Sequence, residues 1–127
     1  MNIIGLVRDI QPSKPQPQLE LYLAQADRSR LPQGSKAPIV LEVAGTQHSG
    51  TICTANANPP YLHHGLTSGG KPSNTTKLLI ALGVAEKARL EFAVASSGVL
   101  RLVRVIDPGK WRAGNEPGER GLRALPT

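Results

Sequence analysis

Apolar and polar residues alternate along several short stretches of this chain, as they do in half-buried β-strands. These stretches, which are rich in Val, Ile and Leu, are residues 2–10, 38–45, 88–94 and 99–105. We expect residues 46–57 to return beside the second stretch as its partner, through residues 51–54. The pattern therefore predicts an architecture made mostly of strands.

The stretch Leu19–Leu23 fits two structures. Its leucines alternate as in a strand, whereas Leu19, Tyr22 and Ala26 share one face of a helix. We favour the strand, because prolines precede it and residues 27–30 follow as a loop.

A short helix is predicted between two well-marked ends. Residues 73–76, Ser-Asn-Thr-Thr, offer side chains that cap a helix N-terminus. Residues 77–82 form the helical run, and Gly83 is suited to the C-terminal cap.

The last two strands are predicted to form a tight hairpin that turns at residues 96–98. Strict alternation points Leu90, Phe92 and Val94 inward. In the return strand the same alternation puts Arg101 and Arg104 on opposite faces. Arginines on a sheet can reach phosphates while their stems cover apolar surface. The plainer alternative is a solvated face with Glu–Arg pairs across the strands.

Length and composition indicate one small domain. The chain has 127 residues, of which 11 are Pro and 13 are Gly, and so many turn residues argue against a helical bundle. Together with the strand pattern they predict a mostly β fold, a small open barrel with one or two short helices, over residues 1–106. Residues 107–127 are expected to form an irregular basic tail.

The formal net charge is +6, from 15 Lys and Arg against 9 Asp and Glu. Such an excess favours an anionic partner such as nucleic acid. The cations are spread along the chain without a basic block, so a binding patch has to be assembled by folding.

The single cysteine, Cys53, excludes an intramolecular disulfide framework. The first residues lack the apolar stretch of a signal peptide, and no run approaches the length of a membrane span. We therefore expect a protein of the reducing cytoplasm with no membrane partner.

Residues 65–72 come within one residue of the phosphate-binding pattern G-x-x-x-x-G-K followed by Ser or Thr. Pro72 stands where the hydroxyl would bind Mg²⁺, so a flexible loop before the helix is the favoured interpretation. A basic glycine loop at a helix N-terminus could still hold a phosphate of a nucleic acid.

Four side chains could in principle bind zinc, but their spacing matches no common zinc motif. They are His48, Cys53, His63 and His64. Cys53 as a nucleophile with a histidine base would need a third, orienting group that the sequence does not show. We therefore predict neither metal nor cofactor, and no catalytic activity.

The order of strands, glycine-rich loop, short Leu-rich helix and hairpin resembles the DNA-binding pseudobarrel. Plant B-three-type transcription-factor domains and the effector domains of EcoRII-type restriction endonucleases share that fold. The residues that carry the likeness, within residues 39–105, are Leu79, Leu82-Gly83-Val84, Leu90-Glu91-Phe92 and Leu100-Arg101-Leu102. The resemblance implies two arms that grip the major groove, and residues 46–58 and 65–77 lie where such arms fall. No arm motif matches residue by residue, and Glu86-Lys87 replaces the family's usual glycine and aspartate.

The sequence thus predicts a non-catalytic module that binds nucleic acid, duplex DNA in the first place. The expected phosphate contacts are Lys71, Lys77, Lys87, Arg89, Arg101 and Arg104. The expected base readers are Gln47, Asn56 and Asn58. Two alternatives stay open, a protein-interaction or structural module of a larger assembly and, less favoured, a small enzyme that uses Cys53.

Overall fold

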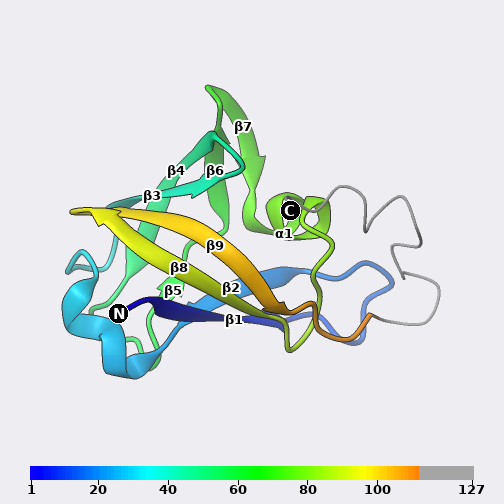
Figure 1. Cartoon of the computed structure of the whole chain (residues 1–127). Helices are drawn as coiled ribbons and strands as arrows, with labels where there is room; N and C mark the ends of the chain where they lie inside the picture. Colours follow the sequence, from blue (N-terminus) through cyan, green and yellow to red (C-terminus); the bar gives the residue numbers. More distant parts are fainter. Residues whose placement is uncertain (112–127) are drawn as a thin grey trace.

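Residues 1–111 are described by a computed structural model (Figure 1). Its elements are, in chain order, β1 (Ile3–Asp9), β2 (Leu19–Leu23), the 3-10 helix η1 (Gln25–Arg30), β3 (Ala37–Val43), β4 (Thr46–Cys53), β5 (Tyr61–Leu62), β6 (Gly65–Ser68), β7 (Lys71–Asn74), α1 (Thr75–Ala81), β8 (Arg89–Ser96) and β9 (Val99–Asp107). The ambiguous stretch Leu19–Leu23 is therefore a strand. Of the tail expected from residue 107 onwards, residues 112–127 lie outside the described part.

The strands close into a ring in the order β3-β9-β8-β1-β2-β5-β4, because β4 pairs back with β3. Every neighbouring pair in the ring is antiparallel except β3 and β9, which run parallel. The strands β6 and β7 extend the sheet from β4 beyond the ring (Figure 1). The predicted class, a mostly β barrel with one or two short helices, is confirmed.

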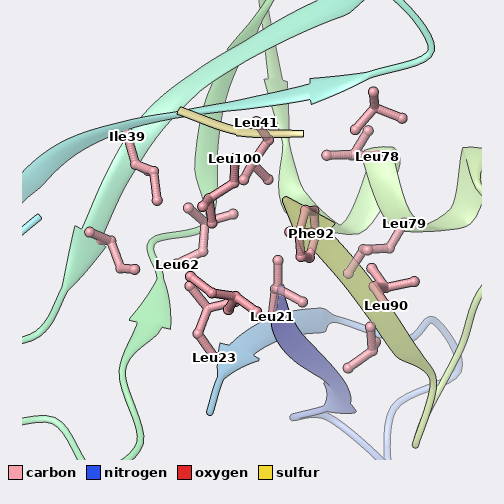
Figure 2. Packing of buried hydrophobic residues seen from close by; sticks show 14 of the residues in the cluster. Leu21, Leu23, Ile39, Leu41, Leu62, Leu78, Leu79, Leu90, Phe92 and Leu100 are labelled. Atoms are coloured by element: carbon pink, nitrogen blue, oxygen red, sulfur yellow. The ribbon is translucent and has the colours of Figure 1, made fainter. Parts of the chain in front are cut away.

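An aliphatic core fills the ring, and Phe92 lies near its centre (Figure 2). The inward positions of β1 are Ile3, Gly5 and Val7, and all three are buried. A Cβ atom on Gly5 would lie 2.9 Å from a methyl of Leu21 and 3.1 Å from the ring of Phe92. The glycine in this strand therefore makes room for the one large aromatic side chain of the core.

The helix α1 lies against one end of the barrel and buries Leu78 and Leu79 there (Figure 2). Its N-cap is Asn74, whose side chain accepts a hydrogen bond of 2.8 Å from the backbone N–H of Lys77. Gly83 follows the helix with a φ of +75°, the left-handed conformation that ends many helices. The predicted caps are thus in place, although the helix begins two residues earlier than expected.

Two local expectations are wrong. Residues 65–71 are not a flexible loop, because β6 and β7 pair as a hairpin that turns at Gly69 and Gly70. This hairpin also separates the glycines from the N-terminus of α1, so they do not form a phosphate-binding loop there. Residues 27–30, expected as a loop, belong to the 3-10 helix η1.

The strict alternation expected of the last hairpin is interrupted by bulges. The register jumps from Glu91 opposite Arg104 to Phe92 opposite Leu102, so Val103 is the extra residue. Arg104 therefore lies on the outer face, together with Arg101, and not on the face opposite to it. Near the tip of the hairpin Val94 is 41% exposed, although alternation placed it inside.

Candidate functional site

Arg101 and Arg104, two of the cations predicted to contact phosphate, form ion pairs on the outer face of the barrel. Arg101 Nη2 lies 3.6 Å from Glu42 Oε1 on β3. Arg104 Nε donates a hydrogen bond of 2.7 Å to Glu91 Oε1 on β8. Hydrogen bonds from Arg104 and then from Asn2 hold the pKa of Glu91 below its ordinary value. The charge of both arginines is therefore offset by a neighbouring carboxylate.

The residues predicted to contact the bases do not lie together in one site. Gln47 lies near one end of β4, and its carbonyl accepts a hydrogen bond from the N–H of Gly69 in the β6–β7 turn, beside Lys71. Asn56 and Asn58 follow the other end of β4. Eight residues of strand span about 25 Å, so Gln47 cannot share a compact site with these two asparagines.

Of the remaining predicted cations, Lys77 is exposed on α1, and Lys87 and Arg89 lie together just before and at the start of β8. The backbone N–H of Lys87 donates to the carbonyl of Val7 at 2.8 Å, which brings it beside Arg8 on β1. Lys87, Arg8 and Lys110 line one open hollow of about 480 Å³. We call Arg8, Lys87, Arg89 and Lys110 the cationic face.

The cationic face forms where the end of β1, the turn before β8 and the end of β9 come together (Figure 1). All four side chains are exposed, and within residues 1–111 none of them forms an ion pair. Arg8 and Lys110 were missing from the predicted site. Only the pairing of distant segments places them beside Lys87 and Arg89, so no local pattern marks them.

A close approach of two backbone segments fixes this corner. A Cβ atom on Gly109 would lie 2.5 Å from the carbonyl oxygen of Glu86 and 2.7 Å from the nitrogen of Ala88. The N–H of Lys110 donates to the same Glu86 carbonyl at 2.7 Å. Lys87 itself has a φ of +69°. Such a left-handed backbone conformation is rare for a residue with a side chain, and residues that adopt it cluster at functional sites. The positions of Lys87 and Lys110 are therefore set by a rigid scaffold.

Four acidic residues lie near the cationic face, and each has a hydrogen-bond donor close by. Asp9 Oδ1 accepts from two backbone N–H groups, at 2.9 and 3.3 Å. Glu86 accepts from the N–H of Asp9, and Asp107 from a backbone N–H at 2.9 Å. Glu20 lies close to the hydroxyl of Tyr22 and raises the pKa of that phenol. In formal charge these four carboxylates balance the four cations. The carboxylates of Asp9, Glu86 and Asp107 accept hydrogen bonds from the backbone, whereas the four cations are exposed and form no ion pair within residues 1–111.

A row of side chains crosses the outer surface of the barrel beside the cations. Strand register places Tyr61 opposite Tyr22, Tyr22 opposite Leu6, and Leu6 opposite Arg89. The rings of Tyr22 and Tyr61 have centroids 6.2 Å apart, and the guanidinium of Arg8 lies 6.0 Å from the centroid of Tyr22. Burial, with the neighbouring Glu20, raises the pKa of Tyr22 to about 12, so its phenol stays neutral.

Three of the four residues considered for zinc or for catalysis have other side-chain partners. His48 Nδ1 lies 2.7 Å from the hydroxyl of Ser68, and burial lowers the pKa of His48. The thiol of Cys53 donates to a backbone carbonyl at 3.1 Å, and His63 Nε2 lies 2.7 Å from another. His48 and Cys53 are five residues apart on β4, so they face opposite sides of the strand. In the described part of the chain no three His, Cys, Asp or Glu side chains gather as a metal site.

Comparison of the chain with protein-family models, with curated proteins and with solved structures finds no match. The resemblance to the DNA-binding pseudobarrel therefore stays a prediction. Among residues 1–111 no helix combines the length and the apolar character needed to cross a bilayer.

Proposed function

We propose that this chain is a non-catalytic module that binds nucleic acid, DNA in the first place, through the cationic face of its barrel. The observation that carries the proposal is the meeting of Arg8, Lys87, Arg89 and Lys110 at one corner, exposed and outside the ion pairs of residues 1–111. Lys and Arg side chains on a rigid scaffold bind phosphate groups and set the position of a protein on nucleic acid.

The predicted cations fall into two groups, with and without an ion pair in the described residues, and we expect the groups to contribute differently to nucleic-acid binding. Arg101 and Arg104 already have carboxylate partners, so a phosphate would have to compete with Glu42 and Glu91. Lys87 and Arg89 form no ion pair within the described residues. We therefore expect the cationic face to dominate binding, with Lys71 and Lys77 as outlying contacts.

Salt dependence of binding to duplex and single-stranded oligonucleotides tests this function in the wild-type protein. Four phosphate contacts predict a slope of log K against log salt concentration of about −3 to −4. Fluorescence anisotropy with labelled oligonucleotides gives this slope. The absence of salt-sensitive binding to either form at low ionic strength would refute the proposal.

The second candidate is a protein-interaction module, which the exposed apolar side chains favour. Leu6 is 39% and Val103 49% exposed on the outer surface. A defined complex with a protein partner that forms without nucleic acid and resists nuclease treatment would support this candidate. Both candidates are placed in a reducing compartment, the cytoplasm, which is supported by the free, buried thiol of Cys53.

A further inference from the structure

Beside the cationic face, the outer surface of the barrel has a second hollow, of about 340 Å³. Its walls include Ile4, Leu6, Tyr22, Ala24, Pro59 and Arg89, and we call it the apolar hollow. The volume lies at the low end of the range of about 300–1,000 Å³ that is usual for small-ligand sites. The hollow is therefore suited to one small group and not to a large ligand.

The chemistry of the walls fits a nucleobase. The aliphatic side chains and the neutral ring of Tyr22 offer an apolar surface for its faces. Arg89 and Gln25 also belong to the lining, but the surface that the hollow offers is almost wholly apolar. Such a surface holds a base by its flat face and is tolerant of base identity, because every base has such a face.

The apolar hollow continues into the cationic face. Leu6 forms part of its wall and lies opposite Arg89. Arg8, two residues further along β1, is on the same side of the strand, about 7 Å away. Lys87 lies beside Arg8, as described above. A nucleotide with its base in the apolar hollow would thus have its neighbouring phosphates next to cations.

We propose that the apolar hollow holds one unstacked nucleobase, so that the protein prefers single-stranded nucleic acid to duplex; this inference rests on the proposed function. A base inside a duplex is stacked and paired, and it has to be turned out of the helix at an energetic cost before it can enter a pocket. A single strand offers its bases without that cost, and base stacking on an aromatic side chain then adds to phosphate binding.

The test compares anisotropy titrations of the full chain with labelled oligo(dT), oligo(U) and a duplex of equal length. The variants are Tyr22→Leu, which removes the ring, and Tyr22→Phe, which keeps it. We expect Tyr22→Leu to weaken single-strand binding about 5- to 150-fold, the range for loss of one base–aromatic stack. Tyr22→Phe should bind as the wild type does, and duplex binding should be the same in all three proteins.

A second variant and a second measurement test the proposal if Tyr22→Leu does not fold. Ala24→Phe fills the apolar hollow from its rim and should weaken single-strand binding as well. In the wild-type protein, addition of oligo(dT) should shift the NMR amide signals of Ile4, Leu6 and Ala24.

The outcomes separate this inference from the proposed function. Tighter binding of oligo(dT) or oligo(U) than of duplex, lost in Tyr22→Leu and Ala24→Phe, supports the base pocket, and the two oligonucleotides distinguish DNA from RNA. Equal binding of duplex, with both variants unchanged, overturns the pocket and leaves nucleic-acid binding standing. Binding of neither form overturns both.

Discussion

Arg104 donates a hydrogen bond of 2.7 Å to Glu91, whereas Arg89, two residues before Glu91 on the same strand, forms no ion pair within residues 1–111. The contrast arises from the bulge at Val103, which turns Arg104 onto the outer face beside Glu91. The two arginines of this hairpin therefore differ in their availability for binding an anionic partner.

The Glu91–Arg104 pair makes a first prediction. Hydrogen bonds from Arg104 and Asn2 lower the pKa of Glu91, so the folded state holds this carboxylate charged more strongly than the unfolded state does. The stabilisation is present above the ordinary Glu pKa and is lost as the pH falls through the lowered value. In Arg104→Gln the pKa of Glu91 should rise towards its ordinary value, as measured by NMR titration of the side-chain carboxyl carbon. An unchanged pKa would contradict the role of this pair.

His48 makes a second prediction. It concerns a base and not an acid, but the stability of the fold should again fall as the pH falls. Burial lowers the pKa of His48, so the unfolded state takes up a proton first as the pH falls below about 6.5. Stability against urea should therefore be full at neutral pH and decline on acidification through the unfolded-state pKa towards the folded-state pKa. His48→Gln removes the titrating group and should show a flatter decline. Parallel declines in the two proteins would exclude His48 as the cause.

Gly109 and Gly70 allow a matched test of how the close backbone contact at Gly109 affects the free energy of unfolding. Both have a positive φ, +84° and +85°, but a Cβ atom on Gly109 would strike the backbone of residues 85–88, whereas one on Gly70 would meet nothing within 4 Å. Gly70→Ala should cost only the conformational term, about 1–2 kcal/mol. Gly109→Ala should cost a further ~1–3 kcal/mol, because the two segments must separate. Chemical denaturation measures both values, and equal costs would show that the close approach at Gly109 does not matter.

Much of the barrel follows from local sequence signals. The alternation in Leu19–Leu23 and in the β3 region marks strands because one face of each is buried. Asn74 and Gly83 bound α1 through cap geometry that involves only neighbouring residues. The pairing of β3 with β4 is a local hairpin and was predicted, whereas closure of the ring by β3 with β9 depends on long-range register, which no local pattern carries.

The candidate site could be predicted only in part for the same reason. Lys87 and Arg89 are close in sequence, so the sequence alone predicts positive charge at the start of the hairpin. Arg8 and Lys110 join them through backbone contacts with distant segments. The bulge at Val103 reverses the face of Arg104, and a single inserted residue has no sequence signature of its own.

Binding of labelled oligonucleotides by two double variants of equal charge decides whether the cationic face is the binding site. Lys87→Gln/Arg89→Gln removes two cations that form no ion pair within residues 1–111, and Arg101→Gln/Arg104→Gln removes two cations that lie in ion pairs. The first variant should lose affinity about tenfold or more at low salt and reduce the salt slope by about 1–2, whereas the second should stay close to wild type. Equal losses in both variants, or no loss in the first, would contradict binding through this face.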